Sequence, residues 1–526
     1  MSAKPNKSLI LISFLLFGYY LYIAYMLYYG GVHSNEALFF TEKSALLREG
    51  DVDQIKLAGL TFPQMPFMFS WVFSFIDLRF SPVLASALGT SALFFIITFS
   101  IRTHEHRNWL FLGILITFIL HPAFIYFAVS GKSSYMMLIF FYLFLISIFR
   151  YFRTNTSYHI SVASIYFTLL IFCSVKFFWL MLFILPIIFF VALQSMTVAK
   201  NDHMDKIAIA FNTESIRRKL VNKTLAIYLV IFALPITAML IFRLLNQVYT
   251  GDADYYLNSP YANYSTITDQ TDNLKNLAQN KLGRIFPEVH FLTTVRIWLF
   301  APLLLFCLGI FKSINRNIFV VFSLFFFMEF LKIKYPNVYI PIHFYAAFIC
   351  LSWAVIANAK SIKELRFSKY FYFSIIILQL FTAYITINSS HVPEEKKYLN
   401  AFVSLIMRKP LYRGDAEKIS NYIRNIKSDD AILADDANAY RIIALTGSAQ
   451  VFLTPGENSF LAALAQPEEH VSYILATKKE SQYDPFGLLN ADMIQMFSLK
   501  GISLHPVCSN KNWILWRIEN KKTYDN

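Results

Sequence analysis

The chain of 526 residues has little charge and little cysteine for its length. Only 15% of its residues are Asp, Glu, Lys or Arg, whereas about a quarter is usual in soluble domains. This low charge argues against an ordinary soluble protein. Three of the four cysteines (Cys173, Cys307, Cys350 and Cys508) lie in apolar blocks, and no pair has metal-ligand spacing. We therefore expect neither a cysteine metal site nor a structural disulfide.

Hydrophobic residues make up 56% of the chain and occur in long continuous blocks, with a mean hydropathy of +0.47. A block of about 18 or more apolar residues forms a helix that crosses the roughly 30 Å hydrocarbon core of a bilayer. The sequence therefore predicts a polytopic α-helical membrane protein. About eleven spans are expected by this criterion, near 9–29, 82–101, 108–128, 134–150, 158–174, 177–195, 223–246, 292–311, 317–333, 339–358 and 370–387.

The net charge of +14 fits this topology better than it fits nucleic-acid binding, which we do not expect. Basic residues gather in alternate short loops, as the positive-inside rule describes. The first block, 9–29, is longer than a signal-peptide core and lacks an A-x-A cleavage site. We interpret it as a retained anchor with a cytoplasmic N-terminus. The loops 30–81 and 247–291 and a tail from 389 then lie outside, which in a bacterial inner membrane is the periplasmic side.

One apolar stretch, 62–76, does not fit this alternation of loops. It is short for a span, it contains Pro63 and Pro66 near its start, and crossing there would move the Arg-rich loops outside. We interpret it as an interfacial helix on the outer leaflet.

The tail has a different composition from the rest of the chain. Helix-like and strand-like patterns alternate, which predicts a small α/β domain with a mostly parallel sheet. The expected domains are therefore 1–388, the transmembrane domain, and 389–526, an extracytoplasmic α/β domain. The predicted strands lie at 431–436, 450–454, 471–477, 502–507 and 513–518.

The first outer loop carries the most informative pattern. Glu36 lies at the start of a predicted helix that Asn35 or Ser34 can cap and Gly50 can end. An acid in a first turn also simply complements the helix dipole. The succession of Asn35-Glu36, Gly50-Asp51 and Pro63/Pro66 resembles the first loop of the GT-C superfamily of membrane glycosyltransferases. The nearest likeness is to its protein O-mannosyltransferase and lipid A aminoarabinose transferase branch.

Further segments extend the resemblance over nearly the whole chain. They are VSGKSS at 129–134, SVKFF at 174–178 and KIKYPNVYIPIHFYAAF at 332–348. The resemblance implies transfer of a sugar from a polyprenyl-phosphate donor, such as undecaprenyl phosphate, with inversion at the anomeric carbon. The acceptor would be lipid A, an O-antigen or other polysaccharide, or a protein.

The resemblance also implies roles for individual residues. Glu36, with Asn35 beside it, would deprotonate the acceptor hydroxyl or hydrogen-bond the sugar. The donor phosphate needs cations, whose ordinary alternative is snorkelling to lipid headgroups. The candidate phosphate ligands are Lys332, Lys334, Lys176, Lys132 and Arg284. The candidate substrate ligands are Tyr339, His343 and Glu329.

Asn35 departs from the family pattern, because the usual catalytic residue there is Asp and an amide is not a base. Either Glu36 takes over, or another carboxylate is used, or the chain is inactive. No cofactor is expected; a divalent metal, which prefers about six oxygen ligands, is not indicated. The alternatives are a flippase or transporter of polyprenyl-linked glycans, a polymerase or ligase of such glycans, and a non-catalytic scaffold. A transporter should show inverted repeats or paired broken helices, and neither is evident.

Overall fold

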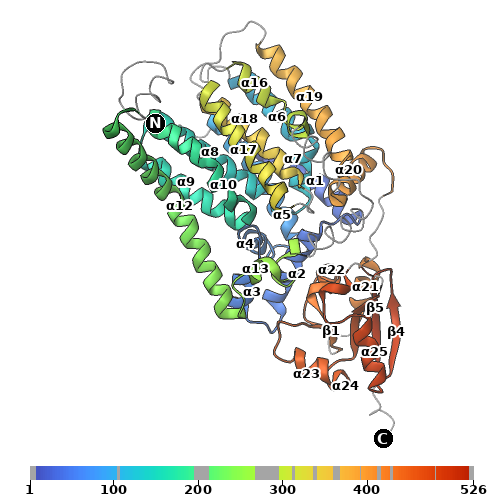
Figure 1. The fold of residues 1–526 in the computed structure, drawn as a ribbon. Coiled ribbons are helices and arrows are strands. Elements are labelled where there is room, and N and C mark those ends of the chain that lie inside the picture. Colours follow the sequence, from blue (N-terminus) through green and yellow to red (C-terminus); the bar gives the residue numbers. More distant parts are fainter. Residues whose placement is uncertain are drawn as a thin grey trace, which may run out of the picture.

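The structure is a computed structural model. It describes residues 7–102, 107–194, 212–266, 295–310, 314–335, 340–358, 368–390, 392–410, 416–426, 430–479, 481 and 483–519. A large helical part is followed by a smaller part that contains a sheet, and the two lie against each other (Figure 1). We call the second part, from α20 onward, the tail.

The helical part begins with a long helix and a cluster of short ones. Its elements are α1 (Lys7–Tyr29), α2 (Asn35–Glu49), α3 (Gln54–Leu60), α4 (Gln64–Phe73), α5 (Ser81–Ile101), α6 (Arg107–Leu120), α7 (Pro122–Val129), α8 (Ser134–Thr154), α9 (Ser157–Cys173), η1 (Val175–Trp179), α10 (Leu180–Gln194), α12 (Glu214–Thr250), α13 (Tyr255–Asn258), α16 (Leu303–Ile310), α17 (Ile314–Lys334), α18 (Ile342–Asn358) and α19 (Ser368–Asn388).

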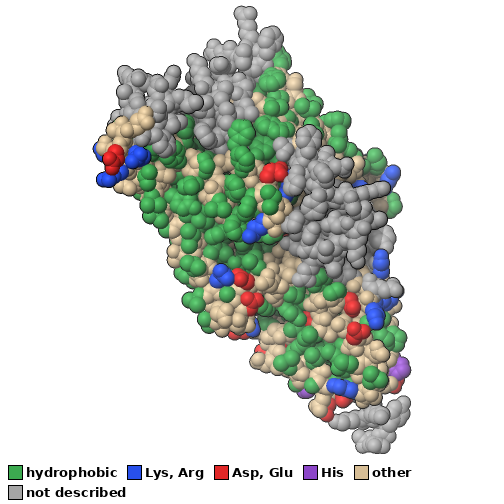
Figure 2. Space-filling model, in the orientation of Figure 1, with side chains coloured by type: hydrophobic (Ala, Val, Ile, Leu, Met, Phe, Trp, Pro, Cys, Tyr) green, Lys and Arg blue, Asp and Glu red, His purple; other side chains and the backbone are tan. Residues whose placement is uncertain are grey.

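Five described helices, α1, α5, α8, α12 and α19, are long and apolar enough to cross a membrane. Hydrophobic side chains cover much of the visible face of the helical part, whereas most charged side chains on that face lie near its ends and on the tail (Figure 2). Such a face suits a hydrocarbon environment. The prediction of a helical chain with several potential spans is confirmed. The predicted number of about eleven is not reached by the helices that the structure describes.

The span predicted at 108–128 is broken into two helices. α6 and α7 meet at an angle of 61°. Pro122 is the first residue of α7, where its missing N–H costs nothing, but it cannot continue α6. His121 Nδ1 accepts a hydrogen bond from the backbone N–H of Ala123 at 3.3 Å and so caps α7. A single broken pair is thus present among the described residues, at the place where a span was predicted.

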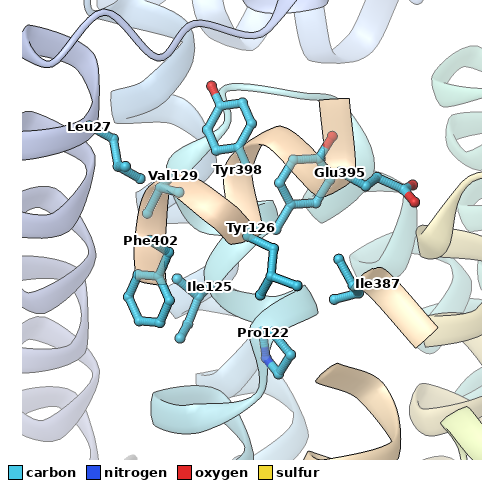
Figure 3. Close-up of a pocket in the computed structure, with 10 residues that line it drawn as sticks. Leu27, Pro122, Ile125, Tyr126, Val129, Ile387, Glu395, Tyr398 and Phe402 are labelled. Carbon is cyan, nitrogen blue, oxygen red and sulfur yellow. The ribbon is translucent and has the colours of Figure 1, made fainter. Parts of the chain in front are cut away.

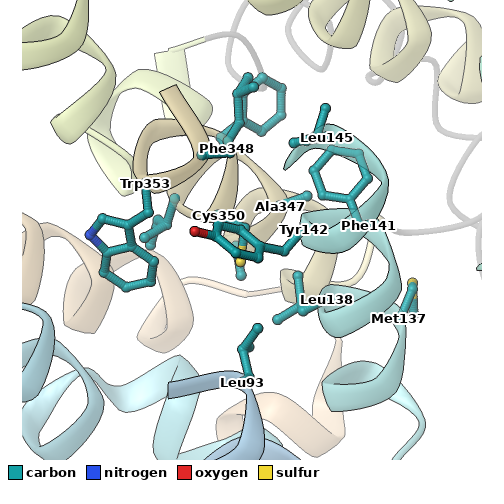
Figure 4. Packing of buried hydrophobic residues seen from close by; sticks show 14 of the residues in the cluster. Leu93, Met137, Leu138, Phe141, Tyr142, Leu145, Ala347, Phe348, Cys350 and Trp353 are labelled. Carbon is teal, nitrogen blue, oxygen red and sulfur yellow. The ribbon is translucent and has the colours of Figure 1, made fainter. Parts of the chain in front are cut away.

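The interior of the helical part is built from interlocking aromatic and aliphatic side chains. α8 packs against α9 and α18, and Figure 4 shows Tyr142, Phe348 and Trp353 within this core. Since lipid is as apolar as these side chains, close packing is what favours helix association here. The predicted interfacial segment is α4, whose 10 residues rise about 15 Å, too little to cross a bilayer.

The tail forms a small sheet with helices on both faces. Its elements are α20 (Pro393–Ile406), α21 (Ala416–Ile423), β1 (Ile432–Ala434), α22 (Asp436–Thr446), β2 (Phe452–Leu453), α23 (Phe460–Ala465), α24 (Pro467–His470), β3 (Tyr473–Thr477), η2 (Asp484–Phe486), α25 (Ala491–Leu499), β4 (Leu504–Ser509) and β5 (Trp513–Ile518).

The strand order is β2-β1-β3-β5-β4. β1 pairs in parallel with β2 and β3, while β5 pairs antiparallel with β3 and β4. The predicted mostly parallel sheet is therefore mixed. Only 510–512 join β4 to β5, and such a short connection permits only antiparallel pairing.

Candidate functional site

The start of α2 fixes the position of Glu36. Ser34 caps this helix, because its Oγ accepts a hydrogen bond from the backbone N–H of Ala37 at 3.2 Å. Glu36 lies in the first turn, and its Oε1 accepts a hydrogen bond from the backbone N–H of Ser133 at 3.0 Å. The carboxylate is thereby held against the loop between α7 and α8.

That loop approaches α2 closely because it contains a glycine. Gly131 has a φ of +71°, and a Cβ there would lie 2.8 Å from the Cβ of Ala37. The backbone N–H of Gly131 donates to Ser86 Oγ at 3.1 Å, which fixes the loop on α5. Any larger residue would push the loop, and with it the Ser133 donor, away from Glu36.

The same loop supplies Lys132, whose ammonium pairs with Glu394. Lys132 Nζ lies 2.6 Å from Glu394 Oε2, and each side chain is 16% exposed. The other oxygen of Glu394 accepts a hydrogen bond from the backbone N–H of Asn35 at 2.9 Å. Glu394 therefore satisfies a free N–H at the start of α2 and also neutralises the cation beside Glu36.

Glu394 was not among the residues predicted from the sequence. Its signal was Pro393-Glu394-Glu395, since proline followed by acids is typical of a helix start. Glu395 acts similarly at another helix, accepting from the backbone N–H of Ile342 at 2.7 Å and from Ser390 Oγ at 2.6 Å. The two neighbouring glutamates of α20 thus bind the starts of α2 and α18.

The two carboxylates on either side of Lys132 have opposite pKa shifts. Burial raises the pKa of Glu36, and the charge of Lys132 and the Ser133 hydrogen bond only partly oppose it. Burial also raises the pKa of Glu394, but the charge and hydrogen bond of Lys132, the hydrogen bond from Asn35 and the charge of Arg441 outweigh it and leave that pKa below its usual value. Glu394 is therefore the fixed anion, and Glu36 is the group suited to take and release a proton.

The remaining predicted residues are divided between two places. His343 Nδ1 lies 3.3 Å from Ser134 Oγ, next to the Ser133 that holds Glu36. Three cations lie instead near the end of α17 and η1. Lys332 Nζ is 3.0 Å from Glu329 Oε1, Lys334 Nζ is 3.9 Å from the centre of the Trp179 ring, and Lys176 Nζ is 5.3 Å from that of Tyr335. Arg284 and Tyr339 lie outside the described residues.

An apolar cleft adjoins the site between α1, α7, α19 and α20. Its lining includes Leu27, Ile125 and Phe402, with the polar ends of Tyr126, Glu395 and Tyr398 along one side (Figure 3). The cavity is small, about 10 Å³, and the ring centre of Tyr126, which lines it, lies 6.0 Å from Lys132 Nζ.

Within the described ranges, no group of three or more His, Cys, Asp or Glu side chains is arranged to hold a metal ion. Lys132 lies beside both Glu36 and Glu394 and supplies the positive charge there. The absence of a metal requirement remains a prediction.

A second charged cluster joins α2 to the tail. Lys43 Nζ lies 2.5 Å from Asp436 Oδ2 and 3.4 Å from Glu42 Oε2, and all three side chains are at most 6% exposed. Asp435 ends β1, caps α22 and accepts a hydrogen bond from Tyr261 OH at 3.2 Å. Lys43 thus occupies the carboxyl end of a parallel strand, where open α/β sheets usually bind ligands.

The comparisons with known proteins concern the fold. No protein-family model matches the chain, and no curated protein matches it. ArnT from Cupriavidus metallidurans, solved bound to undecaprenyl phosphate, is similar with 8% identity and a TM-score of 0.49, over 98% of each chain. The oligosaccharyltransferase AglB from Archaeoglobus fulgidus, in complex with an inhibitory peptide and a dolichol-phosphate, is similar with 10% identity and a TM-score of 0.41, over 94% of this chain and 71% of that one. Both are GT-C proteins, the superfamily that the sequence resembles. Both TM-scores are below 0.5, so neither likeness carries an argument about function.

Proposed function

We propose that the chain is a membrane glycosyltransferase that moves a sugar from a polyprenyl-phosphate donor to a hydroxyl group of a cell-envelope acceptor. One observation carries the proposal: a carboxylate with a raised pKa, Glu36, lies beside a buried ammonium, Lys132, that a second carboxylate holds in place. A base next to a cation suits a reaction that removes a proton from a nucleophile and expels an anion.

Glu36 acts as the base. It takes the proton of the acceptor hydroxyl as the acceptor oxygen forms a bond to the anomeric carbon of the sugar. The bond between that carbon and the phosphate oxygen breaks, and polyprenyl phosphate leaves with the electron pair. Attack from the side opposite the leaving group inverts the configuration.

Lys132 stabilises the leaving phosphate. An ammonium group has three N–H donors, and Glu394 accepts one of them, so the others can bind phosphate oxygens. The ion pair with Glu394 keeps the ammonium charged despite its burial, and the pKa of Lys132 is raised accordingly.

We place the site on the periplasmic face of a bacterial inner membrane, with a cytoplasmic N-terminus. The support for this orientation is the distribution of Lys and Arg among the loops. The acceptor is a lipid, a glycan or a protein of the cell envelope, with lipid A and O-antigen among the choices.

The test is sugar transfer by the purified chain from radiolabelled polyprenyl-phosphate sugars. Glu36→Gln keeps the shape of the side chain and removes the base, so we expect transfer to fall by about 100-fold or more while donor binding is kept. Glu214→Gln is the matched control, because Glu214 is exposed at the start of α12. Full activity in Glu36→Gln contradicts the assignment of the base.

A flippase that uses the same lipids gives a different result. Wild-type protein in vesicles would then move labelled polyprenyl lipid across the bilayer without transferring sugar. That outcome would overturn the proposed transferase.

A further inference from the structure

The tail brings a second cation to the edge of the site. Arg441 lies on α22, which packs against α2, the helix that carries Glu36. Its Nη1 donates to Tyr483 OH at 2.5 Å, and its guanidinium lies 5.7 Å from the centre of the Tyr483 ring. Tyr483 stacks on Trp513 at 4.9 Å, so the arginine has a rigid aromatic support.

Arg441 Nε and Tyr440 OH are both buried, and neither has a hydrogen-bond partner in the part of the chain that the structure describes. Tyr440 is 0% exposed and its ring centre lies 6.1 Å from that of Phe39, one turn along α2 from Glu36. Leaving a buried donor unpaired costs about 1–3 kcal/mol, so an anion that accepts from both atoms would be stabilised here.

The charges around Glu394 point to the kind of ligand. Burial raises the pKa of Glu394, whereas Lys132 and the hydrogen bond from Asn35 lower it. The charge of Arg441 lowers it further, by a smaller amount. Lys397 lies one turn beyond Glu394 on α20, where burial and the charge of Arg441 lower its pKa against the opposing charges of Glu394 and Glu417. Three cations, Lys132, Lys397 and Arg441, thus lie within electrostatic reach of the carboxylates Glu394 and Glu417.

We propose that Arg441 and Tyr440 form a phosphate-binding site at the edge of the Glu36–Lys132–Glu394 site. The planar guanidinium offers N–H groups spaced to match two oxygens of a phosphate, and the tyrosine hydroxyl adds a third donor. This phosphate-binding site differs from the one proposed at Lys132, because its main phosphate-binding residue, Arg441, belongs to the tail.

The choice of phosphate source rests on the proposed function. The phosphate belongs either to the polyprenyl donor or to a phosphorylated sugar of the acceptor. Both sources present a phosphate group, but only the donor carries a polyprenyl chain. Two probes therefore distinguish them: undecaprenyl phosphate in nanodiscs, and soluble glucosamine 1-phosphate.

The experiment measures equilibrium binding of each probe to the full chain. We expect Arg441→Gln to weaken one probe by about 10-fold or more, the usual loss for a charged hydrogen bond. Tyr440→Phe removes only a hydroxyl that has no partner, so the variant should fold as the wild type does and bind the same probe more weakly. Arg517→Gln is the control, since Arg517 is exposed on β5 and its loss removes the same charge from the tail.

The probe that is weakened identifies the source of the phosphate. Unchanged binding of both probes in either Arg441→Gln or Tyr440→Phe overturns the proposal. Because binding is measured without sugar transfer, a chain that binds phosphate through Arg441 but transfers no sugar contradicts the proposed function alone.

Discussion

At the scale of single residues, Glu394 controls both the charge of Lys132 and the proton affinity of Glu36. The negative charge of Glu394 adds to the burial that raises the pKa of Glu36. In Glu394→Gln the negative charge that raises the pKa of Glu36 is removed, while the positive charge of Lys132 that lowers it remains. The pKa of Glu36 therefore falls, and Glu36 becomes a weaker base. We expect about a 10-fold or greater loss of kcat, and the acidic limb of the pH–rate profile should move to lower pH. A profile with an unmoved acidic limb contradicts this role.

Gly131 is a second position at which one residue decides the site. In Gly131→Ala the new Cβ meets Ala37 on a backbone with positive φ, so we expect the protein to lose about 1–2 kcal/mol of stability and most of its transfer activity. Thermal unfolding and transfer assays measure the two losses. Gly18→Ala, where a Cβ meets no atom within 4 Å, is the matched control and should change neither.

The sequence indicated part of this site. The helix that carries Glu36 was predicted from its first-turn acid and from Gly50 after it, whereas the catalytic role of Glu36 was implied by the resemblance to the GT-C first loop. Glu394 lies 359 residues away from Asn35, whose N–H it accepts, and no local pattern reports a contact of that range. The sequence marks Glu394 as lying at the start of its own helix, α20, but its carboxylate stabilises the start of another helix, α2.

At the scale of elements, the contact between α2 and α22 should respond to pH through Glu42. Burial raises the pKa of Glu42 from 4.5 to about 8, with Lys43 opposing and Asp436 adding to the shift. The folded protein then holds a proton that the unfolded chain releases, so the free energy of unfolding falls as the pH rises towards and through about 8.

We expect the Tm to fall by a few degrees, on the order of 1–2 kcal/mol, as pH rises from about 6 to about 9. Glu42→Gln carries no titrating group and should flatten this dependence. Glu468→Gln, exposed on α24, should keep it. An equal fall of Tm in Glu42→Gln would show that another group is responsible.

The elements themselves were largely predictable from sequence. Long apolar blocks and the alternation in the tail place helices and strands because periodicity and length are local properties. The angle between α6 and α7 and the antiparallel pairing of β5 depend on Pro122 and on a short connection, whose spatial consequences are not local. Hence the positions of helices and strands along the chain were predicted better than their orientations relative to one another.

At the scale of the whole molecule, the Lys43–Asp436 ion pair fastens the tail to the helical part. Removing one member of a buried pair leaves an uncompensated charge and costs about 3–5 kcal/mol, whereas replacing both with apolar residues is nearly neutral. We expect Lys43→Met and Asp436→Leu each to lower the Tm strongly, and the double variant to recover most of the loss. The measurement belongs near pH 6, where Glu42 is protonated.

Limited proteolysis should report the same order among these variants, with the single substitutions releasing the tail most readily. A double variant as unstable as the singles would mean that the pair itself, and not the uncompensated charge, holds the parts together.

The distance between the two partners of this ion pair along the chain sets an order on biosynthesis. Lys43 and Asp436 are 393 residues apart, so a growing chain completes α2 long before its partner strand and helix exist. During that interval Lys43 has no Asp436 with which to pair. A chain that terminates early, anywhere before α22, never closes this contact. The ion pair therefore forms only in a chain that has been translated beyond Asp436.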